Sequence, residues 1–292
     1  MRTPRARAIR EGQGLAAARA NVNCAPQHSS QRMDRNMLPR KTLLSWSTGK
    51  DSAWTLHRLR QDASLQLVGL VTTINAAFGR VAMHGVRREL LEQQAAAAGL
   101  PVFELPIPHP CPNEVYQRSM GEFVARQQAA GVEAIAFGDL FLEDIRRYRE
   151  QALAGTGMTP LFPLWGLDTA VLAREMVAAG LAGYISALDP DRLPVRFAGR
   201  GFDAELLVEL PAGVDPCGEN GEFHTFACAG PMFDRPIAVT RGEVVLREGF
   251  VFCDLRPAQA AVAASSRSRC DRRVGRADDT GAKDPSPARR RR

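Results

Sequence analysis

The sequence lacks the features that mark membrane, secreted or zinc-stapled proteins. No apolar run approaches the roughly 18 residues that a membrane-spanning helix needs. The six cysteines form no C-x-x-C pair, and the Arg-rich start has no continuous apolar segment of the kind found in secretory leaders. We therefore expect a cytoplasmic protein with free thiols and no membrane partner.

The chain has 292 residues, 45% of them hydrophobic, which is enough to bury a core in one large domain or two smaller ones. Its positive charge is concentrated at the ends, since residues 1–40 carry eight Arg against two acidic residues and residues 257–292 are also basic. Neither end has periodic apolar residues, so we expect both to be disordered, with Met33 and Met37 as alternative translation starts. The region between the ends is acidic overall, so no nucleic-acid partner is expected.

The stretch Leu43–Leu59, LLSWSTGKDSAWTLHRL, organises the rest of the chain. Residues of strand character lead into a Ser-Thr-Gly-Lys-Asp-Ser turn, and apolar residues then recur at helical spacing. A helix N-terminus presents unpaired N–H groups, Gly49 permits close approach and Lys50 adds positive charge, so the pattern predicts a phosphate site. The alternative is an ordinary turn in which Asp51 and Ser52 cap the helix.

The spacing of this turn excludes a Walker A loop. That pattern has another Gly five residues before Gly49, where this chain has Leu44, and Ser or Thr after the Lys, where it has Asp51. The six residues Ser47–Ser52 instead resemble the Ser-Gly-Gly-x-Asp-Ser pyrophosphate loop of the ATP pyrophosphatases, the adenine nucleotide alpha hydrolase-like group. Thr48 stands where that pattern has Gly, which removes the freedom to adopt a positive φ.

Strands and helices alternate after this loop. Leu67–Thr73 is a continuous apolar run, typical of a strand buried on both faces. Further elements are expected as helix 86–98, extended segment 101–108, helix 113–131, strand 134–137, helix 142–153, helix 168–179 and strand 182–187, with Asn113 and Asp168 as helix caps. The alternation predicts a doubly wound, mainly parallel α/β sheet over residues 41–188.

Three segments fall at the carboxyl ends of predicted strands, where ligands of such sheets lie. They are the loop Ser47–Ser52, the segment Thr72–Asn75 with Thr73 as its candidate binding residue, and Gly138 with Asp139 after the strand 134–137. We expect them to converge on one ligand.

A smaller α+β domain is expected over residues 189–256. Phe202–Leu210 suggests a short helix, and short strands follow, with turns at Arg241-Gly242 and Glu248-Gly249.

The loop PCGENGEFHTF places Glu219 and Glu222 three residues apart in a turn too glycine-rich to be a helix. Two carboxylates on an exposed, mobile backbone can coordinate Mg²⁺, accept a hydrogen bond from ammonium or act as a general base. The alternative is a solvated turn. Cys217, His224 and Cys228 match no common zinc spacing.

Taken together, STGKDS, GDLFLEDIRRYRE, LFPLWG and GENGEFHTF, in this order, resemble the diphthine-ammonia ligase (diphthamide synthetase) family over about residues 41–255. The resemblance implies a nucleotide-binding domain followed by a substrate domain, with ATP and Mg²⁺ as cofactors. It also implies amide formation, in which a carboxylate substrate is activated as its adenylate, pyrophosphate is released, and ammonia or an amine is the acceptor.

The resemblance also implies roles for individual residues. Phosphate binding is assigned to Ser47, Thr48, Gly49, Lys50, Asp51 and Ser52, with Asp51 as the metal ligand and with Thr73, Gly138 and Asp139 beside the nucleotide. Catalysis is assigned to Lys50, Asp51, Glu219 and Glu222. Asn220 replaces a Gly of the family's Glu-Gly-Gly-Glu-Phe loop. Arg146 and Arg149 either neutralise phosphate or substrate carboxylate, or form an exposed helix face.

Other functions stay open at this stage. A nucleotide-dependent tRNA-modifying enzyme shares pyrophosphate loops, but it would require a catalytic Cys pair and an RNA-binding domain. A non-catalytic ATP-binding protein is the third possibility. The abundance of Arg and Ala suggests a GC-rich bacterial source, and bacteria are not expected to make diphthamide, so the substrate can differ from diphthine.

Overall fold

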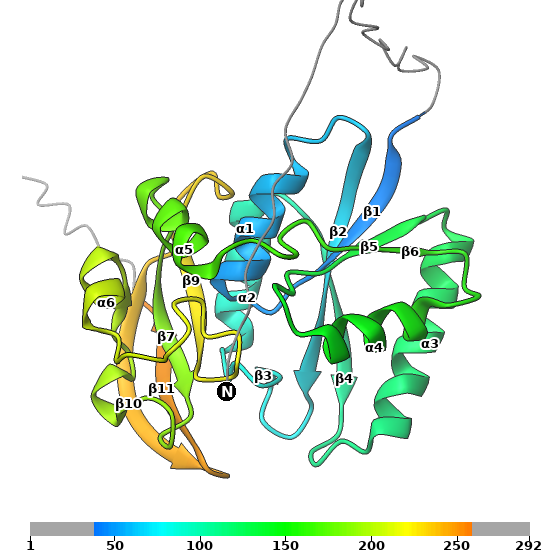
Figure 1. Cartoon of the computed structure of the whole chain (residues 1–292). Coiled ribbons are helices and arrows are strands. Elements are labelled where there is room, and N and C mark those ends of the chain that lie inside the picture. Colours follow the sequence, from blue (N-terminus) through cyan, green and yellow to red (C-terminus); the bar gives the residue numbers. More distant parts are fainter. Residues whose placement is uncertain (1–37, 259–292) are drawn as a thin grey trace, which may run out of the picture. The chain divides into compact units, whose positions relative to one another are not determined.

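The structure, a computed structural model, describes residues 38–258 (Figure 1). The expectations of disordered ends and of alternative starts therefore fall almost entirely outside the described residues. From Arg40 onward the described chain forms one unit that contains two β-sheets.

The first sheet has five parallel strands in the order β4, β2, β1, β5, β6, and a two-residue strand, β3, runs antiparallel to β2. The strands are β1 (Arg40–Ser45), β2 (Leu65–Asn75), β3 (Arg80–Val81), β4 (Val102–Ile107), β5 (Ala134–Ala136) and β6 (Thr159–Leu161). The segment between β2 and the next helix, for which no strand was predicted, thus contains β3. The sequence analysis also did not anticipate β6.

Helices cover both faces of this sheet, which confirms the doubly wound α/β class. They are α1 (Lys50–Leu59), α2 (Arg88–Ala98), α3 (Asn113–Ala129) and α4 (Glu143–Leu153). Successive side chains of a strand point to opposite faces, and Leu43 and Leu44 of β1 lie in separate apolar clusters. Leu44 packs in the cluster with α1 and α2, whereas Leu43 packs in the cluster with Phe123 of α3 and Leu153 of α4 (Figure 1).

The second sheet is antiparallel, with the order β10, β11, β7, β8 and with β9 also paired to β7. Its strands are β7 (Ala182–Leu188), β8 (Gly201–Phe202), β9 (Phe223–Ala229), β10 (Val239–Arg247) and β11 (Phe250–Pro257). The helices α5 (Thr169–Ala178) and α6 (Ala204–Glu209) and the 3₁₀ turn Val195–Phe197 belong to this part of the chain. The helix α6 confirms the one expected near Phe202–Leu210.

The strand expected at 182–187 does not extend the first sheet, so that prediction is wrong. An apolar run indicates a buried strand but does not say which sheet buries it. Gly183 of β7 lies so close to β9 that a Cβ on it would be 2.4 Å from the Phe226 carbonyl oxygen, so glycine lets these two strands approach.

Two of the predicted caps and turns are corrected. The N-cap of α3 is Pro112, and Asn113 is its first helical residue, with its Oδ1 accepting a hydrogen bond from Tyr148 OH at 3.3 Å. Arg241-Gly242 is not a turn but an irregularity within β10, where a Cβ on Gly242 would be 2.7 Å from the Asp254 carbonyl oxygen.

The predicted cap at Asp168 and the predicted turn at Glu248-Gly249 are confirmed. Asp168 caps α5 by accepting a hydrogen bond from Val171 N at 2.8 Å. Gly99 ends α2 in the left-handed conformation with φ 64°. Glu248 and Gly249 have φ 51° and 85°, as a two-residue hairpin turn with two positive φ values requires.

The sheet order fixes where a ligand can lie. From the central β1 the chain builds outward on one side to β2 and β4, and then crosses to β5 and β6 on the other. In such sheets, ligands usually bind beyond the carboxyl ends of the strands, in the crevice at the point where the strand order reverses. Here this point lies between β1 and β5. The loops that follow β1 and β5 flank this point.

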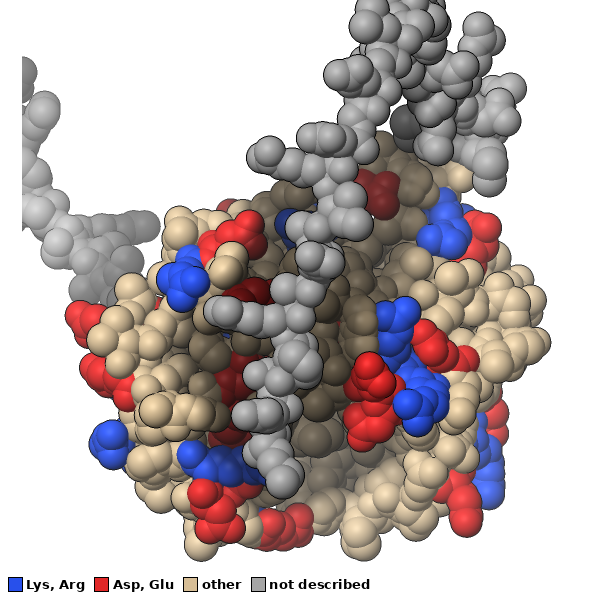
Figure 2. Space-filling model, viewed as in Figure 1, with Lys and Arg blue, Asp and Glu red and all other residues tan. Residues whose placement is uncertain are grey.

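None of the described helices is both long and apolar enough to cross a bilayer. On the face shown in Figure 2, Lys and Arg are interspersed with Asp and Glu.

Candidate functional site

The loop Ser47–Ser52, called the phosphate loop below, is held together by hydrogen bonds of its two terminal serines. Ser47 Oγ lies 3.2 Å from Ser52 Oγ and accepts a hydrogen bond from Gly49 N at 3.3 Å. Ser52 Oγ is also 3.0 Å from the Gly49 carbonyl oxygen, to which it donates. The N-cap of α1 is Gly49, which has no side chain to cap the helix, and the N–H of Lys50 donates to Thr225 of β9, so the reading of Asp51 and Ser52 as simple caps is wrong. The first turn of α1 therefore has N–H groups without partners in the helix, which suits an anion.

Thr48 adopts a positive φ, so the expectation that a non-glycine residue excludes this conformation here is wrong. Its φ is 71°, although a β-branched residue is strained there by on the order of 1–3 kcal/mol. Its carbonyl oxygen accepts two hydrogen bonds, from Ala227 N and from Gln94 Nε2, both at 2.9 Å. These contacts from β9 and α2 hold the loop in its strained conformation.

Gln94 is a central residue of the site that the sequence analysis missed. It is fully buried, its Oε1 accepts from Trp46 Nε1 at 2.9 Å, and its Nε2 donates to the Ala227 carbonyl at 2.6 Å as well as to Thr48. It therefore ties α2, the phosphate loop and the second sheet together. The available signal was an amide in the apolar stripe that Leu90, Leu91 and Ala95 form on α2.

Lys50 joins the phosphate loop to the loop that carries the two glutamates. Its side chain is 2% exposed, and Nζ lies 2.8 Å from Asp51 Oδ2 and also donates to the Cys217 carbonyl. Nζ lies 5.7 and 5.6 Å from the ring centroids of Phe202 and Phe223. Burial lowers the pKa of Lys50, but the charge of Asp51 and other nearby groups outweighs it, so the pKa is raised and the ammonium stays protonated.

Asp215 fixes the conformation of the loop Pro216–Phe226, called the glutamate loop, through two hydrogen bonds. The Asp215 carboxylate accepts from Glu219 N at 2.8 Å, and Asp215 N donates to Glu222 Oε1 at 3.0 Å. Asn220 Nδ2 also donates to Glu222 Oε1, at 3.1 Å. Glu222 is 3% exposed. The expectation of an exposed turn is therefore wrong for Glu222, because this loop packs between the two sheets.

Glu219 connects its loop to the segment that follows β5. Its Oε1 accepts a hydrogen bond from Leu140 N at 2.8 Å. Burial raises the pKa of Glu219 to about 7, although the Leu140 N–H opposes this shift. A carboxyl group with this pKa can gain or release a proton near neutral pH, as a general acid or base must.

Gly138 and Asp139 lie beside the start of α1. A Cβ on Gly138 would be 3.1 Å from the Asp51 carbonyl carbon, so glycine permits this approach. Burial raises the pKa of Asp139, and the charge of Arg149, whose Nε is 3.7 Å from Asp139 Oδ2, opposes the shift. Burial also raises the pKa of Asp51 against the effect of Lys50. The structure thus gathers three carboxylates, those of Asp51, Asp139 and Glu219, with Lys50 beside Asp51 and Arg149 beside Asp139.

Arg149 is a partner of this cluster, and Arg146 is not. The Arg149 guanidinium stacks 5.0 Å from the ring centroid of Phe137. Arg146 instead pairs with Glu150 at 2.8 Å, and its guanidinium lies 4.9 and 4.7 Å from the ring centroids of Phe162 and Trp165. The LFPLWG motif thus supplies the aromatic rings against which Arg146 packs.

Thr73 stands apart from the other predicted binding residues. It lies in β2, where its carbonyl accepts a hydrogen bond from Ala82 N at 3.0 Å.

Two stacked histidines, His84 and His224, lie next to Gly49 and Thr225. The rings of His84 and His224 stack with centroids 4.5 Å apart, and His84 Nδ1 is 3.1 Å from the Thr225 carbonyl. Burial lowers the pKa of His224 to about 4 and holds that of His84 well below its usual value. Thr225 Oγ1 accepts a hydrogen bond from Lys50 N at 3.0 Å. The lowered pKa values keep both imidazoles neutral near pH 7.

Within residues 38–258, no group of three His, Cys, Asp or Glu side chains is arranged to hold a metal ion by itself. The four cysteines of this region, including Cys217 and Cys228, are free thiols.

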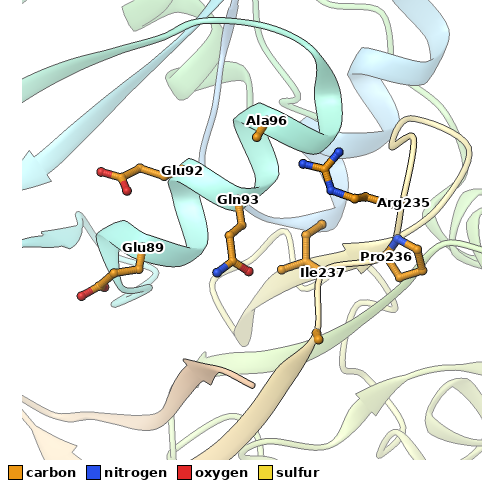
Figure 3. Close-up of a pocket in the computed structure, with 8 residues that line it drawn as sticks. Glu89, Glu92, Gln93, Ala96, Arg235, Pro236 and Ile237 are labelled. Atoms are coloured by element: carbon orange, nitrogen blue, oxygen red, sulfur yellow. The ribbon is translucent and has the colours of Figure 1, made fainter. Parts of the chain in front are cut away.

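A surface hollow of about 390 Å³ lies away from these residues, on α2 and on the segment that leads into β10 (Figure 3). Glu89, Glu92 and Gln93 line one side of it, and Arg235 and Ile237 line the other. None of the predicted site residues reaches it.

Comparison with known proteins identifies the family of this arrangement. Residues 40–160 match the diphthamide synthase N-terminal domain, and residues 168–260 match the diphthamide synthase C-terminal domain. The chain belongs to the diphthamide synthase family. The two matched regions divide between β6 and α5, where the chain passes from the first sheet to the second.

Members of the diphthamide synthase family in other organisms are similar over about 130 residues. The chain is 34% identical to diphthine--ammonia ligase of Homo sapiens over 131 residues, which are 41% of this chain and 47% of the relative. It is 33% identical to the Danio rerio protein of that name over 127 residues, which cover 41% and 49%. The Schizosaccharomyces pombe protein is 27% identical over 129 residues, 43% of this chain and 21% of the relative. The chain thus spans about half the length, or less, of these relatives.

Proposed function

We propose that this protein is an ATP-dependent ligase. It activates a carboxylate as its adenylate, releases pyrophosphate, and transfers the acyl group to ammonia or an amine. The observation that carries this proposal is the joining of the phosphate loop to the glutamate loop through Lys50, whose ammonium contacts both Asp51 and the Cys217 carbonyl. The diphthine--ammonia ligase names of the relatives support the same reaction class.

The first step forms a bond between a substrate carboxylate oxygen and the α-phosphorus of ATP, and it breaks the bond to the oxygen that leaves with pyrophosphate. Negative charge develops on that leaving group. The Lys50 ammonium and the N–H groups of the first turn of α1 would stabilise the charge, because fixed donors in a buried site need no reorganisation.

Mg²⁺ fits the acidic side of the site. Asp51 Oδ1 and Asp139 Oδ2 are buried and have no hydrogen-bond partner among the described residues. Mg²⁺ prefers oxygen ligands and is usually bound by one or two carboxylates together with substrate phosphates. Asp51 and Asp139 would therefore hold it, where it would neutralise phosphate charge.

The second step forms the amide bond and releases AMP. The nitrogen attacks the carbonyl carbon of the adenylate, and the nitrogen must lose a proton as the bond forms. Glu219, with its pKa near neutrality, is suited to take this proton. Glu222 would hold the loop and orient the acceptor through Oε2, which is buried and has no partner among the described residues.

The products distinguish this proposal from other ATP chemistry. The protein is incubated with MgATP, ammonium and a panel of small carboxylates and carboxylate-bearing peptides, and the nucleotides are separated by chromatography. We expect AMP and pyrophosphate, and we expect Asp51→Ala to abolish both while the exposed control Asp144→Ala retains them. ADP and phosphate as the main products would contradict the proposal.

A further inference from the structure

A second cavity, of about 590 Å³, lies at the carboxyl ends of β2 and β4. Asn75 and Ile107, the last residues of those strands, line it together with residues of the β10–β11 hairpin. This volume is in the range of small-molecule sites, and this edge of the sheet is the one that carries the phosphate loop.

The walls of this cavity are largely apolar. Phe78 and Met83, which are 54% and 75% exposed, lie on one wall, and Val245, Phe250 and Phe252 of the hairpin lie on the other. Large apolar side chains exposed beside a cavity mark a site where an apolar molecule or group is covered.

One end of the cavity carries an excess of positive charge. Asp254 accepts hydrogen bonds from three guanidinium groups: Arg80 Nη2 at 2.8 Å, Arg87 Nε and Nη2 at 2.9 and 2.8 Å, and Arg256 Nε at 2.7 Å. Asp254 neutralises one of the three cations, and Glu243, which lines the same cavity from the part of β10 opposite Asp254, offsets a second, so one net positive charge remains. Each guanidinium has five N–H donors, so this cluster retains both the charge and the donors to bind a further anion.

The cavity adjoins the phosphate loop through the histidine pair. His224 lines the cavity, and the next residue, Thr225, binds Lys50 N. His84 stacks on His224 and lies close to Gly49 of the phosphate loop. A Cβ on Gly49 would be only 2.9 Å from His84 Cε1. The histidine pair therefore lies between the cavity and Gly49 of the phosphate loop.

We propose that this cavity binds the carboxylate substrate, and that the substrate is an organic anion with an apolar body. The apolar body lies between Phe78 and the hairpin, and an anionic group lies against the arginines around Asp254. The assignment rests on the proposed ligase function. It adds the class of substrate and places it on the β4 side of the phosphate loop.

The test uses anilinonaphthalene sulfonate, a fluorescent aromatic anion, and phenylnaphthylamine, the same skeleton without the sulfonate. The full chain is titrated with each probe. Arg256→Gln removes one cation but leaves Asp254 paired to two others. We expect it to weaken binding of the anionic probe by about fivefold, the upper range for a partly exposed ion pair, with binding of the neutral probe unchanged.

Val245→Glu and Leu246→Glu form a matched pair on β10. Val245 lines the cavity, whereas Leu246 points to the other face of the strand and is 68% exposed. We expect Val245→Glu to weaken binding of the anionic probe by about tenfold or more, because it places an unpaired charge on an apolar wall. Leu246→Glu should bind the probe as the unmodified protein does.

Adding MgATP to the complex of protein and probe distinguishes a cavity for the carboxylate substrate from a cavity for the nucleoside of ATP. We expect MgATP to leave the probe bound, because the nucleotide occupies the phosphate loop. Displacement of the probe by MgATP would assign the cavity to the nucleoside and overturn the proposal, and so would equal losses in Val245→Glu and Leu246→Glu or an unchanged Arg256→Gln. These titrations require no turnover, so their failure is distinct from a failure of the ligase function, which the products of ATP report.

Discussion

Replacement of Gln94 by leucine tests how the phosphate loop is held. Leucine is apolar and of similar size, so the change removes three hydrogen bonds with little change in volume. Thr48 O keeps its bond from Ala227 N, but Trp46 Nε1 loses the partner that Gln94 Oε1 provides. A buried polar group left unpaired costs about 1–3 kcal/mol, and the lost bonds to carbonyls add about 1 kcal/mol each, while the leucine returns about 1–2 kcal/mol by burial.

We therefore expect Gln94→Leu to lower the free energy of unfolding by about 3 kcal/mol, measured by urea denaturation. It should also weaken ATP binding, because Thr48 loses one of the two contacts that hold its positive φ. Gln93→Leu is the matched control, since Gln93 is the exposed neighbour on the same helix. A loss below about 1 kcal/mol for Gln94→Leu, or an equal loss for both variants, would refute this account of the loop.

Three further changes test individual residues. Thr48→Ala should be less stable than Thr48→Gly by about 1 kcal/mol in denaturation, because alanine keeps a Cβ at positive φ and glycine does not; equal stabilities would show that the strain is absent. The raised pKa of Glu219 means that the folded state retains a proton which the unfolded state loses, so its stabilising contribution is present at acidic pH and is lost as pH rises to about 7. Denaturation between pH 5 and 8 should show this loss in the unmodified protein and not in Glu219→Gln, and parallel profiles would contradict the shift. Glu222→Gln should leave ATP affinity within a few-fold and reduce amide formation by roughly 10²-fold, the scale of a lost acid–base or orienting group, whereas near-normal turnover would return Glu222 to a purely structural role.

The sequence predicted the parts of the fold that depend on local pattern. The strand–loop–helix around Gly49, the cap at Asp168 and the hairpin turn at Glu248-Gly249 each rest on a few neighbouring residues whose conformational preferences are strong. The family motifs likewise led to the correct family, because four of them occur in order along the chain.

The features that the sequence did not predict depend on contacts between distant segments. The strand Ala182–Leu188 reads as buried, but only its pairing with β9 and β11 places it in the second sheet. Glu222 reads as a loop residue, and it becomes buried because Asp215 draws the loop inward. Gln94 looks in the sequence like any other polar residue of a helix. Its role depends on three hydrogen-bond partners that are distant in the sequence, Trp46, Thr48 and Ala227.

The most direct test of the central claim follows a carboxylate oxygen. A substrate carboxylate labelled with heavy oxygen is incubated with the protein, MgATP and ammonium, and the AMP that forms is analysed by mass spectrometry. Adenylation predicts that one labelled oxygen appears in the phosphate of AMP, with pyrophosphate unlabelled, and that Asp51→Ala forms no labelled AMP. AMP that forms without label would show that the carboxylate never attacks the α-phosphorus, and it would contradict the account.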